Sequence, residues 1–538
     1  MTKIFIFNNA CRAAGYGIGT YVSQLSDSLS VRPDTKVLHV DMYAETKEFA
    51  VKLDDQGRTH YLIPPLNGQI ESEIYCRCIF YFLARNIELD ENDKIVFQFN
   101  YFQHYPLAML LKAWYPKCII MLTVHYMSWC FALEGNVRRM REITAEGYEP
   151  SDEKEKQVVL SFAQERLFLH LADTVFVLSK STKSVLVNDY KVVLNKIHLV
   201  YNGIGTQTCY HISRQERTGR TILFVGRLEK GLKYLVDAFI RIADAHPDSN
   251  LVIVGDGDFQ SYMAQSRKLL GRVVFLGKMD KNEIEDVYQS AYIGVLPSFH
   301  EQCSYTAIEM MRHGIPIVGT DSIGLNEMLD ITPELQAHIG EVSFKEDDFV
   351  SQIASRMNLL LSDETVYRHV SNAVYQQYEK RYTVTAMSEG VQKALSSALT
   401  ATDRYVSPDY LSHIDDHMIG LINKHPDIDM DFYGLSGIGV YLWWRVLQME
   451  KEYIVDINRL ALIKEHLIYY LDWVEEMVAN EPLTIELSET LVSMQKHLFF
   501  PTKVAHLLKY SKMVCEKDSF PSEQTILHNA LKICTCKI

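Results

Sequence analysis

The sequence predicts two doubly wound, Rossmann-like α/β lobes that face each other across a cleft, followed by an all-α segment. Short runs rich in β-branched and aromatic residues alternate with helical patterns from the first residues, which is typical of buried parallel strands. The alternation starts again after Asn202-Gly203, a turn signal. The strand signal fades from about residue 400, where amphipathic helical patterns such as the one over 461–478 dominate.

The predicted strands fall into two series, one for each lobe. They lie at residues 3–7, 36–40, 94–99, 118–124 and 174–178, and then at 221–225, 251–254, 273–276, 293–296 and 315–318. Apolar residues from Leu232 to Ala243 follow helical spacing between the first two strands of the second series, which indicates a right-handed crossover and a parallel sheet. We therefore predict an N-terminal lobe over 1–205, a second lobe over 206–380, a crossing helix over 381–400 that packs back on the first lobe, and a helical appendage over 401–538.

Size and charge limit the classes of function. The 538 residues are too many for one hydrophobic core, and the net charge of -14 argues against nucleic acid or anionic lipid as a mainly electrostatic partner. The N-terminus lacks the pattern of a signal peptide, and no stretch reaches the roughly 18 uncharged apolar residues of a membrane-spanning helix. We expect a cytoplasmic protein, and peripheral membrane contact stays open.

The cysteines and the acidic clusters do not predict a metal centre. The two close cysteine pairs, Cys76/Cys78 and Cys534/Cys536, have one intervening residue, which is not a zinc-ribbon spacing, so we expect reduced and mostly buried thiols. The acidic string at 427–431 lies in the appendage and is interpreted as surface charge. We expect no metal in the active site.

The most informative segment is 299–320, between two strands of the second lobe. Glu301 precedes a helix predicted to start near Ser304, and Glu309 lies about a turn and a half inside it. Free N–H groups and partial positive charge at a helix start suit a diphosphate, and a carboxylate can accept hydrogen bonds from a ribose diol. The candidate donor-binding residues here are Cys303, Ser304, Tyr305, Thr306 and Glu309.

The string EQCSYTAIE at 301–309 resembles the Glu, seven residues, Glu signature of retaining GT-B glycosyltransferases, those of glycosyltransferase family four, or glycosyl transferases group 1. Gln302 stands where that family usually has a small residue. The resemblance implies a UDP- or GDP-linked hexose as donor, no cofactor, and transfer with retention by front-face attack, in which the departing phosphate takes the acceptor's proton. It also implies that Glu301 lies near the sugar.

The strand end and helix start at 224–239 resemble the same family's Gly-Arg-Leu and Lys-Gly pattern. Arg227 and Lys230 are the candidate cations for the diphosphate, which gains negative charge as the glycosidic bond breaks. The spacing between them is shorter than the family usually has. Opposite charge supplied by these side chains and by a helix dipole would replace a metal ion.

Two further turns follow strands of the second lobe. Gly255 and Gly257 match the family's Gly-x-Gly turn, where glycine permits positive φ and close approach of the nucleotide. Backbone groups near Leu276 and Gly277 match the strand end that reads the base.

In the first lobe, Gly15, Gly17 and Gly19 follow the first strand and open a helix, where N–H groups can hold phosphate. They also fit a dinucleotide fingerprint, for which Asp41 is the one acidic candidate, but the resemblance favours a loop over the cleft. His125 ends the strand at 118–124, where the family often has a histidine facing the reaction centre. We expect it to bind the donor sugar or ease departure of the leaving group.

Two segments keep alternative interpretations. The highly charged residues 134–157 fit a mobile loop on the acceptor side or a solvated pair of helices. The glycines of 431–444 faintly resemble the turns of lanthionine-cyclase-like helical toroids, but a helix-entry turn is favoured, because the zinc ligands of those enzymes are not evident.

Two rival functions remain. One is a nucleotide-sugar epimerase or a phosphorylase on the same scaffold, because a fold does not fix a reaction. The other is a GT-B-shaped subunit without catalysis that presents the acceptor to a partner. The sequence names neither the acceptor, which could be a glycan, a peptide or a lipid-linked molecule, nor the oligomeric state.

Overall fold

The structure is a computed structural model. It describes residues 1–10, 17–47, 49–65, 72–87, 90, 92–205, 219–269, 271–339, 344–401, 408–424, 435, 437–451, 456–478, 483 and 485–515. The predictions for Gly15, for the acidic string at 427–431 and for Cys534 and Cys536 lie outside the described residues.

The first sheet contains all five strands predicted for the first lobe. Its strands are β1 (Thr2–Asn9), β2 (Thr35–Met42), β3 (Ala50–Leu53), β4 (Thr59–Ile63), β5 (Lys94–Phe99), β6 (Ile119–Val124), β7 (Thr174–Val177) and β8 (Ile197–Leu199), in the order β3-β4-β2-β1-β5-β6-β7-β8. The pairing of β1 with β2 and β5 is parallel, whereas β3 runs antiparallel to β4 at the edge. The sequence did not predict β3, β4 or β8, which are short or largely polar.

The second sheet has six strands, which pair in parallel. They are β9 (Arg220–Val225), β10 (Ser249–Val254), β11 (Val273–Gly277), β12 (Ile293–Leu296), β13 (Ile317–Thr320) and β14 (Gln336–Ala337), in the order β11-β10-β9-β12-β13-β14. The predicted crossover helix is α8 (Leu232–Ile242). All five predicted strands are confirmed, and the two-residue β14 was missed. Two doubly wound lobes are therefore confirmed.

Burial explains why these runs form strands. Every residue of β6 and of β12 is buried, as expected for central strands covered on both faces. In the first sheet, Phe7 stacks on Phe99 with ring centroids 4.5 Å apart, and Phe5 packs against Phe97 at 5.6 Å. The large apolar residues that predicted the strands therefore form the core.

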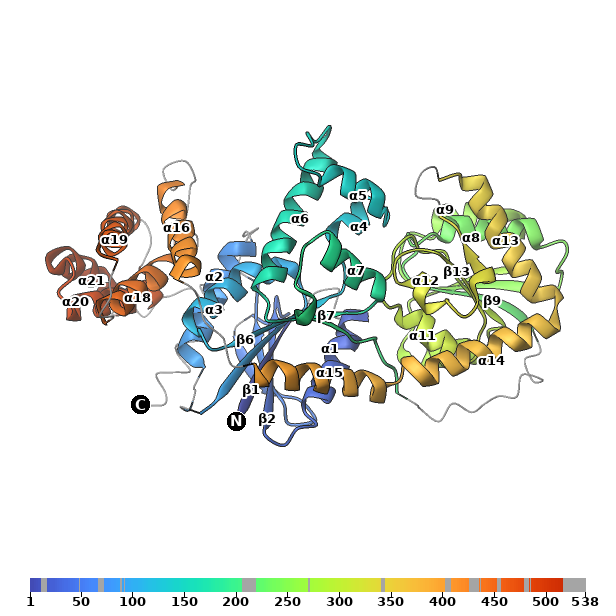
Figure 1. The fold of residues 1–538 in the computed structure, drawn as a ribbon, viewed down its shortest axis with the longest axis horizontal. Helices are drawn as coiled ribbons and strands as arrows, with labels where there is room; N and C mark the ends of the chain where they lie inside the picture. The colour runs from blue at the N-terminus through green and yellow to red at the C-terminus, as the bar shows by residue number, and fades with distance from the viewer. Residues whose placement is uncertain are drawn as a thin grey trace. The chain divides into compact units, whose positions relative to one another are not determined.

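Contacts divide the chain into two compact units (Figure 1). Unit 1 comprises Met1–Gly15, Arg32–Met121 and Leu399–Ile538, and unit 2 comprises Tyr16–Val31 and Leu122–Ala398. The boundaries predicted from the sequence stay a prediction.

The C-terminal run of helices belongs to unit 1. It consists of α16 (Pro408–Lys424), α18 (Ile438–Lys451), α19 (Ile457–Met477), α20 (Ile485–Lys496) and α21 (Pro501–Cys515). It packs on α2 (Ser72–Asn86) and α3 (Tyr105–Trp114), beside which α16 lies in Figure 1. Trp444 stacks on Trp114 at 4.9 Å, and the Tyr410 hydroxyl donates to the Met109 carbonyl at 2.9 Å.

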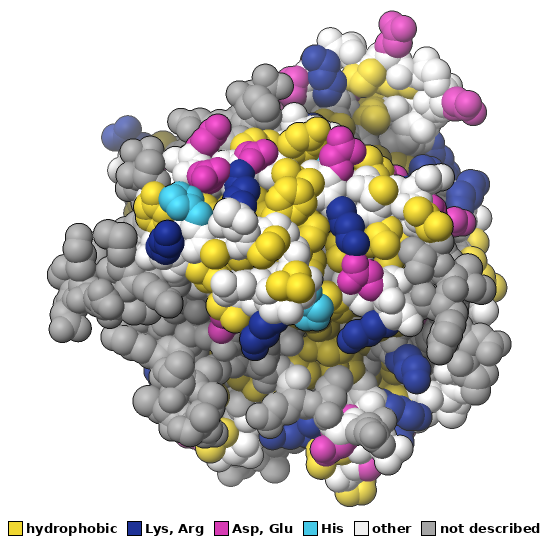
Figure 2. Space-filling view, turned by 90° about the vertical axis from the view of Figure 1, so that its left-hand side faces the viewer, with side chains coloured by type: hydrophobic (Ala, Val, Ile, Leu, Met, Phe, Trp, Pro, Cys, Tyr) yellow, Lys and Arg dark blue, Asp and Glu magenta, His cyan; other side chains and the backbone are white. Residues whose placement is uncertain are grey.

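The helical run has apolar side chains on its surface. Figure 2 shows the side of the molecule on which these helices lie in Figure 1, and hydrophobic side chains gather near the middle of that view. Tyr469, Val492, Leu498 and Phe500 are exposed members of these helices or of the turn between them.

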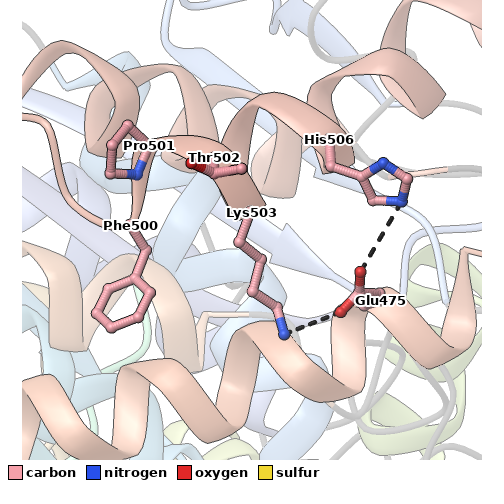
Figure 3. A pocket seen from close by; sticks show the side chains of 6 residues that line it. All are labelled: Glu475, Phe500, Pro501, Thr502, Lys503 and His506. Atoms are coloured by element: carbon pink, nitrogen blue, oxygen red, sulfur yellow. Dashed lines mark ion pairs between the residues drawn. The ribbon is translucent and has the colours of Figure 1, made fainter.

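A pocket of about 800 Å³ lies beside α19 and the start of α21 (Figure 3). It is lined by Glu475, Phe500, Pro501, Thr502, Lys503 and His506. Lys503 Nζ lies 2.9 Å from a Glu475 carboxylate oxygen and is also paired with Asp472. Because its lysine is already neutralised by two carboxylates, this pocket does not suit a diphosphate.

No helix among the described residues is long and apolar enough to span a bilayer. Cys76, Cys78, Cys118, Cys130 and Cys303 are buried free thiols, as the sequence predicts.

The helix α15 (Val384–Thr400) follows the second lobe and contacts residues from the first part of the chain. Ile204 forms a parallel bridge with Thr383, and a Cβ on Gly390 would lie 3.2 Å from Val200 Cγ1. The Gln392 side-chain amide donates to the Ser28 carbonyl at 2.5 Å. The return of this helix onto the first lobe stays a prediction of the sequence.

Candidate functional site

The helix α11 (Tyr305–Arg312) begins where the sequence predicts a phosphate-binding helix start. Ser304 is its N-cap, with extended backbone angles and a side-chain oxygen that accepts from the Ala307 N–H at 3.3 Å. Tyr305 and Thr306, the first two helical residues, are partly exposed. The helix start therefore carries the partial positive charge of the helix dipole, with N–H groups that have no partner within the helix.

The loop that leads into α11 is held by a close backbone approach. Gly324 has φ +79°, and a Cβ there would lie 2.1 Å from the Glu301 carbonyl oxygen, so only glycine fits. The Glu301 N–H donates to the Ile323 carbonyl at 3.1 Å, and the buried Asn202 amide donates to the Cys303 carbonyl at 2.7 Å. These contacts hold the backbone of Glu301 in place.

Gln302 stands where the family usually has a small residue. Its side chain is long enough to form a hydrogen bond that a small residue could not form. It is buried, and its side-chain oxygen accepts a short hydrogen bond from the Thr182 hydroxyl. Thr182 lies in the first turn of α7 (Lys180–Asn188). The amide thus connects the loop before α11 to a helix of the first lobe.

Lys230 and Glu301 form an ion pair, with Nζ 2.5 Å from Oε1. Their loops follow β9 and β12, which are neighbours in the sheet, so the carboxyl ends of both strands bring the loops together at the point where strand order reverses. Gly231 caps α8 with φ +83°, and a Cβ there would lie 2.2 Å from the Pro297 carbonyl oxygen. The shortened loop therefore keeps Lys230 at Glu301.

Arg227 lies in the same loop but pairs with Glu229 at 3.1 Å, and both side chains are exposed. Burial lowers the pKa of the neighbouring His300, while the Glu301 charge opposes this shift and the charges of Lys230 and Arg227 add to it. The charges of both predicted cations, Arg227 and Lys230, therefore reach His300, the residue before Glu301. The structure joins Lys230, but not Arg227, directly to Glu301.

Glu309 is held by a residue that sequence reasoning missed. Tyr288, on α10 (Lys281–Ser290), donates its hydroxyl to Glu309 Oε2 at 2.6 Å and is almost fully buried. Burial and the adjacent carboxylate raise the pKa of Tyr288 far above its usual value, so it remains a donor. Nothing in the local sequence signals this role, because the two residues meet only through helix packing.

The glycine turns after β9, β10 and β11 lie against one another. A Cβ on Gly255 would lie 1.8 Å from the Gly226 carbonyl oxygen, and one on Gly257 would lie 2.9 Å from Leu228 Cγ. The Gly255 N–H donates to the Gly277 carbonyl at 2.9 Å. Leu276 is 43 % exposed beside this turn. The predicted Gly-x-Gly and base-reading turns are thus adjacent.

The first lobe contributes the start of α1 (Gly17–Leu29), which includes Gly17 and Gly19. A Cβ on Gly17 would lie 3.3 Å from Tyr305 Cδ2, and the Tyr305 hydroxyl donates to the Gln24 side-chain oxygen at 2.8 Å. The N-terminal ends of α1 and α11, both predicted to bind phosphate, therefore lie side by side within unit 2.

His125 follows β6, as predicted, and packs edge-on against Tyr21 with ring centroids 4.6 Å apart. The Tyr21 hydroxyl bonds to the Thr123 hydroxyl at 2.9 Å, which fixes that ring. Burial lowers the pKa of His125 to about 3, so the imidazole is neutral at neutral pH. It can therefore exchange hydrogen bonds with a sugar hydroxyl but does not supply a standing positive charge.

This shift predicts a pH dependence of stability. In the unfolded chain His125 titrates near 6.5, so between about pH 6.5 and about 3 the unfolded state binds more protons and the free energy of unfolding falls as pH decreases. A His125→Gln variant should show a shallower fall in this window when urea unfolding is measured from pH 7.5 to 4. Equal slopes for both proteins would contradict the assignment.

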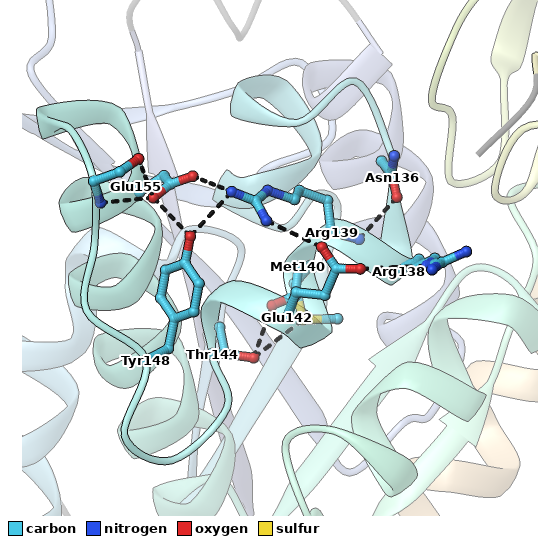
Figure 4. Close-up of polar contacts among 9 residues, drawn as sticks. Asn136, Arg138, Arg139, Met140, Glu142, Thr144, Tyr148 and Glu155 are labelled. Carbon is cyan, nitrogen blue, oxygen red and sulfur yellow. Dashed lines mark hydrogen bonds and ion pairs between the residues drawn. The ribbon is translucent and has the colours of Figure 1, made fainter. Parts of the chain in front are cut away.

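The charged segment 134–157 is helical rather than a free loop (Figure 4). It contains α5 (Val137–Ile143) and the start of α6 (Glu153–Leu171). Arg139 and Tyr148 both bond to the Glu155 carboxylate, which also accepts from the Ser151 N–H at 2.8 Å. The Ser151 hydrogen bonds lower the pKa of Glu155 to about 2. Of the two interpretations, the pair of helices is the one observed.

The turn before α5 touches the candidate site, which the sequence did not indicate. A Cβ on Gly135, at φ +74°, would lie 2.6 Å from the Phe299 carbonyl oxygen. The Phe131 ring packs edge-on against His300 with centroids 4.7 Å apart. These contacts place first-lobe residues next to the segment that carries Glu301.

Residues 219–363, which hold all of the second-lobe site residues, match the family model for glycosyl transferases group 1. Residues 219–363 are therefore a segment of the glycosyl transferases group 1 type. An uncharacterised glycosyltransferase of Methanocaldococcus jannaschii is 32% identical over 184 residues, which cover 31% of this chain and 47% of the relative. The chain thus spans less than half the length of that curated relative.

Solved structures extend the likeness in fold to both lobes of the chain. A sucrose-phosphate synthase from Thermosynechococcus elongatus superposes with a TM-score of 0.59 at 18% identity, covering 75% of this chain and all of that one. An Anabaena protein solved with UDP and glucose superposes with a TM-score of 0.52 at 14% identity, covering 73% of this chain and 99% of that one. At these identities the likeness shows the fold, which is the predicted GT-B arrangement.

Proposed function

We propose that the chain is a retaining glycosyltransferase that moves a hexose-type sugar from a UDP- or GDP-linked donor to an acceptor. The observation that carries the proposal is the Lys230–Glu301 pair at the entry to α11, a helix capped by Ser304. In this scheme Lys230, Arg227 and the helix dipole balance the charge of the leaving diphosphate. Glu309 binds the ribose diol, and Glu301 and His125 bind the sugar.

The family supports use of a nucleotide sugar, and the superposed Anabaena protein was solved with UDP and glucose. The front-face scheme requires no carboxylate base and no metal, because the departing phosphate accepts the acceptor's proton. The cytoplasmic location stays a prediction of the sequence, which names neither an acceptor nor an oligomeric state.

Hydrolysis without acceptor tests the reaction class. We expect slow release of free UDP or GDP from one nucleotide sugar, unchanged by EDTA, and anomeric retention in the sugar product by NMR. Net conversion to another nucleotide sugar would favour the epimerase, and a requirement for inorganic phosphate would favour the phosphorylase. Tight binding without any turnover, with or without acceptor extracts, would favour the presenting subunit.

A further inference from the structure

A second group of reactive side chains lies on the first sheet, within unit 1. His39 and Asp41 are two residues apart on β2, so both point to the same face of the sheet. His60 lies on β4 directly opposite His39 in parallel register. The two imidazole rings stack with centroids 4.3 Å apart, and His60 Nδ1 lies 2.7 Å from Asp41 Oδ2. Strand register thus gathers two imidazoles and one carboxylate.

We propose that His39, Asp41 and His60 bind a divalent transition metal ion of the zinc class. One ligand atom from each residue lies within 4.8 Å of the other two, and among the residues that the structure describes no other such group occurs. Metal bonds of about 2.0–2.2 Å place tetrahedral ligands about 3.3–3.6 Å apart, so the His60–Asp41 pair must open by up to about 1 Å and the two parallel imidazole rings must tilt toward a common point. Imidazole and carboxylate ligands suit zinc, cobalt and nickel.

The surroundings supply the outer contacts that such a site needs. His60 Nε2 is buried without a hydrogen-bond partner and lies 3.5 Å from Asp54 Oδ2. With the metal on Nδ1, the remaining ring proton sits on Nε2 and faces Asp54, a carboxylate–histidine–metal arrangement. Arg58 fixes Asp54 through its N–H at 2.8 Å and its Nε at 2.7 Å.

Protonation is compatible with metal binding. Burial lowers the pKa of His39 to about 4, so this imidazole is neutral at pH 7, as a ligand must be. The hydrogen bond to Asp41 raises the pKa of His60, and the metal takes the place of the proton that these two residues share. His60 and Asp41 are partly exposed, which leaves a path for the ion and for a water ligand.

Metal titration of the full chain tests the site. Tag-free protein is stripped with EDTA, dialysed, and titrated with zinc by calorimetry and with cobalt by its visible d–d absorption. We expect about one equivalent bound and a higher Tm with zinc. His60→Gln should weaken binding by at least about 100-fold and Asp54→Asn by about 10-fold, as loss of a ligand or an outer contact does.

A matched control is available in the second lobe. His338 Nδ1 lies 2.7 Å from Asp321 Oδ2, the same distance as between His60 and Asp41. This pair is not part of the proposed site, so His338→Gln should leave metal binding unchanged. Far-UV circular dichroism checks the fold of each variant, and Asp41→Asn replaces His60→Gln if that chain is unfolded. The proposal would be overturned if the wild-type protein bound less than about 0.1 equivalent of metal. It would also be overturned if a folded His60→Gln or Asp41→Asn variant bound metal as tightly as the wild type, because His60 and Asp41 would then form only a hydrogen-bonded pair.

Discussion

Replacing Lys230 with methionine is expected to lower kcat by about 10²- to 10³-fold, the usual cost of removing one group that stabilises developing charge. Lys230 is part of a 2.5 Å ion pair with Glu301, at the strand ends where the leaving diphosphate is proposed to lie. Methionine keeps much of the apolar stem, so packing is preserved while the charge is lost. Turnover is measured with saturating nucleotide sugar, by release of free nucleotide.

Lys233, in the first turn of α8 and three residues after Lys230, provides the matched control. Its Nζ lies 2.6 Å from Glu346 Oε1, and both side chains are exposed. Lys233→Met should therefore leave kcat within about twofold, because an exposed surface pair contributes little. If Lys230→Met kept a third or more of wild-type kcat, or if Lys233→Met lost as much, Lys230 would not be the leaving-group cation.

The second large effect is expected at Glu309. Glu309→Ala should lower kcat/KM by about 10²- to 10³-fold, mainly through a higher KM for the donor, because each hydrogen bond to a charged group contributes about 1.5–3 kcal/mol. UDP and GDP should bind more weakly to the variant by a similar factor in calorimetry, since the ribose belongs to the nucleotide. The retained fold is checked by circular dichroism.

Two further variants, at Tyr288 and Glu364, test whether the loss of donor binding in Glu309→Ala is specific to Glu309. Tyr288→Phe removes the hydroxyl that holds Glu309 at 2.6 Å, so a smaller loss of about 10-fold in donor KM, with kcat nearly unchanged, identifies a positioning residue. Tyr292 and Glu364 form a similar pair at 3.3 Å on an exposed part of the same lobe, and Glu364→Ala should not change donor affinity. Unchanged nucleotide affinity in Glu309→Ala would refute the ribose assignment.

Local pattern predicted most of the fold and many of the site positions. The runs that form β5 and β12 coincide with the predicted strands residue for residue, because continuous apolar sequence of that length packs as a buried strand. Ser304 could be placed as a helix start for the same kind of local reason, since its side chain caps the N–H groups that follow. The edge strand β3 and its neighbour β4 could not be predicted, because they are partly exposed and lack a continuous apolar run.

The sequence by itself determined two lobes of alternating strands and helices, a helical C-terminal run, and the chemical types of the candidate groups. Only the tertiary structure decided which groups meet: Glu301 with Lys230, Glu309 with Tyr288, and His39 with His60. Strands and helices can be predicted because their patterns depend on residues only a few positions apart in the sequence. The pairings depend instead on strand order, register and helix packing, which many distant contacts fix together and which no local pattern encodes.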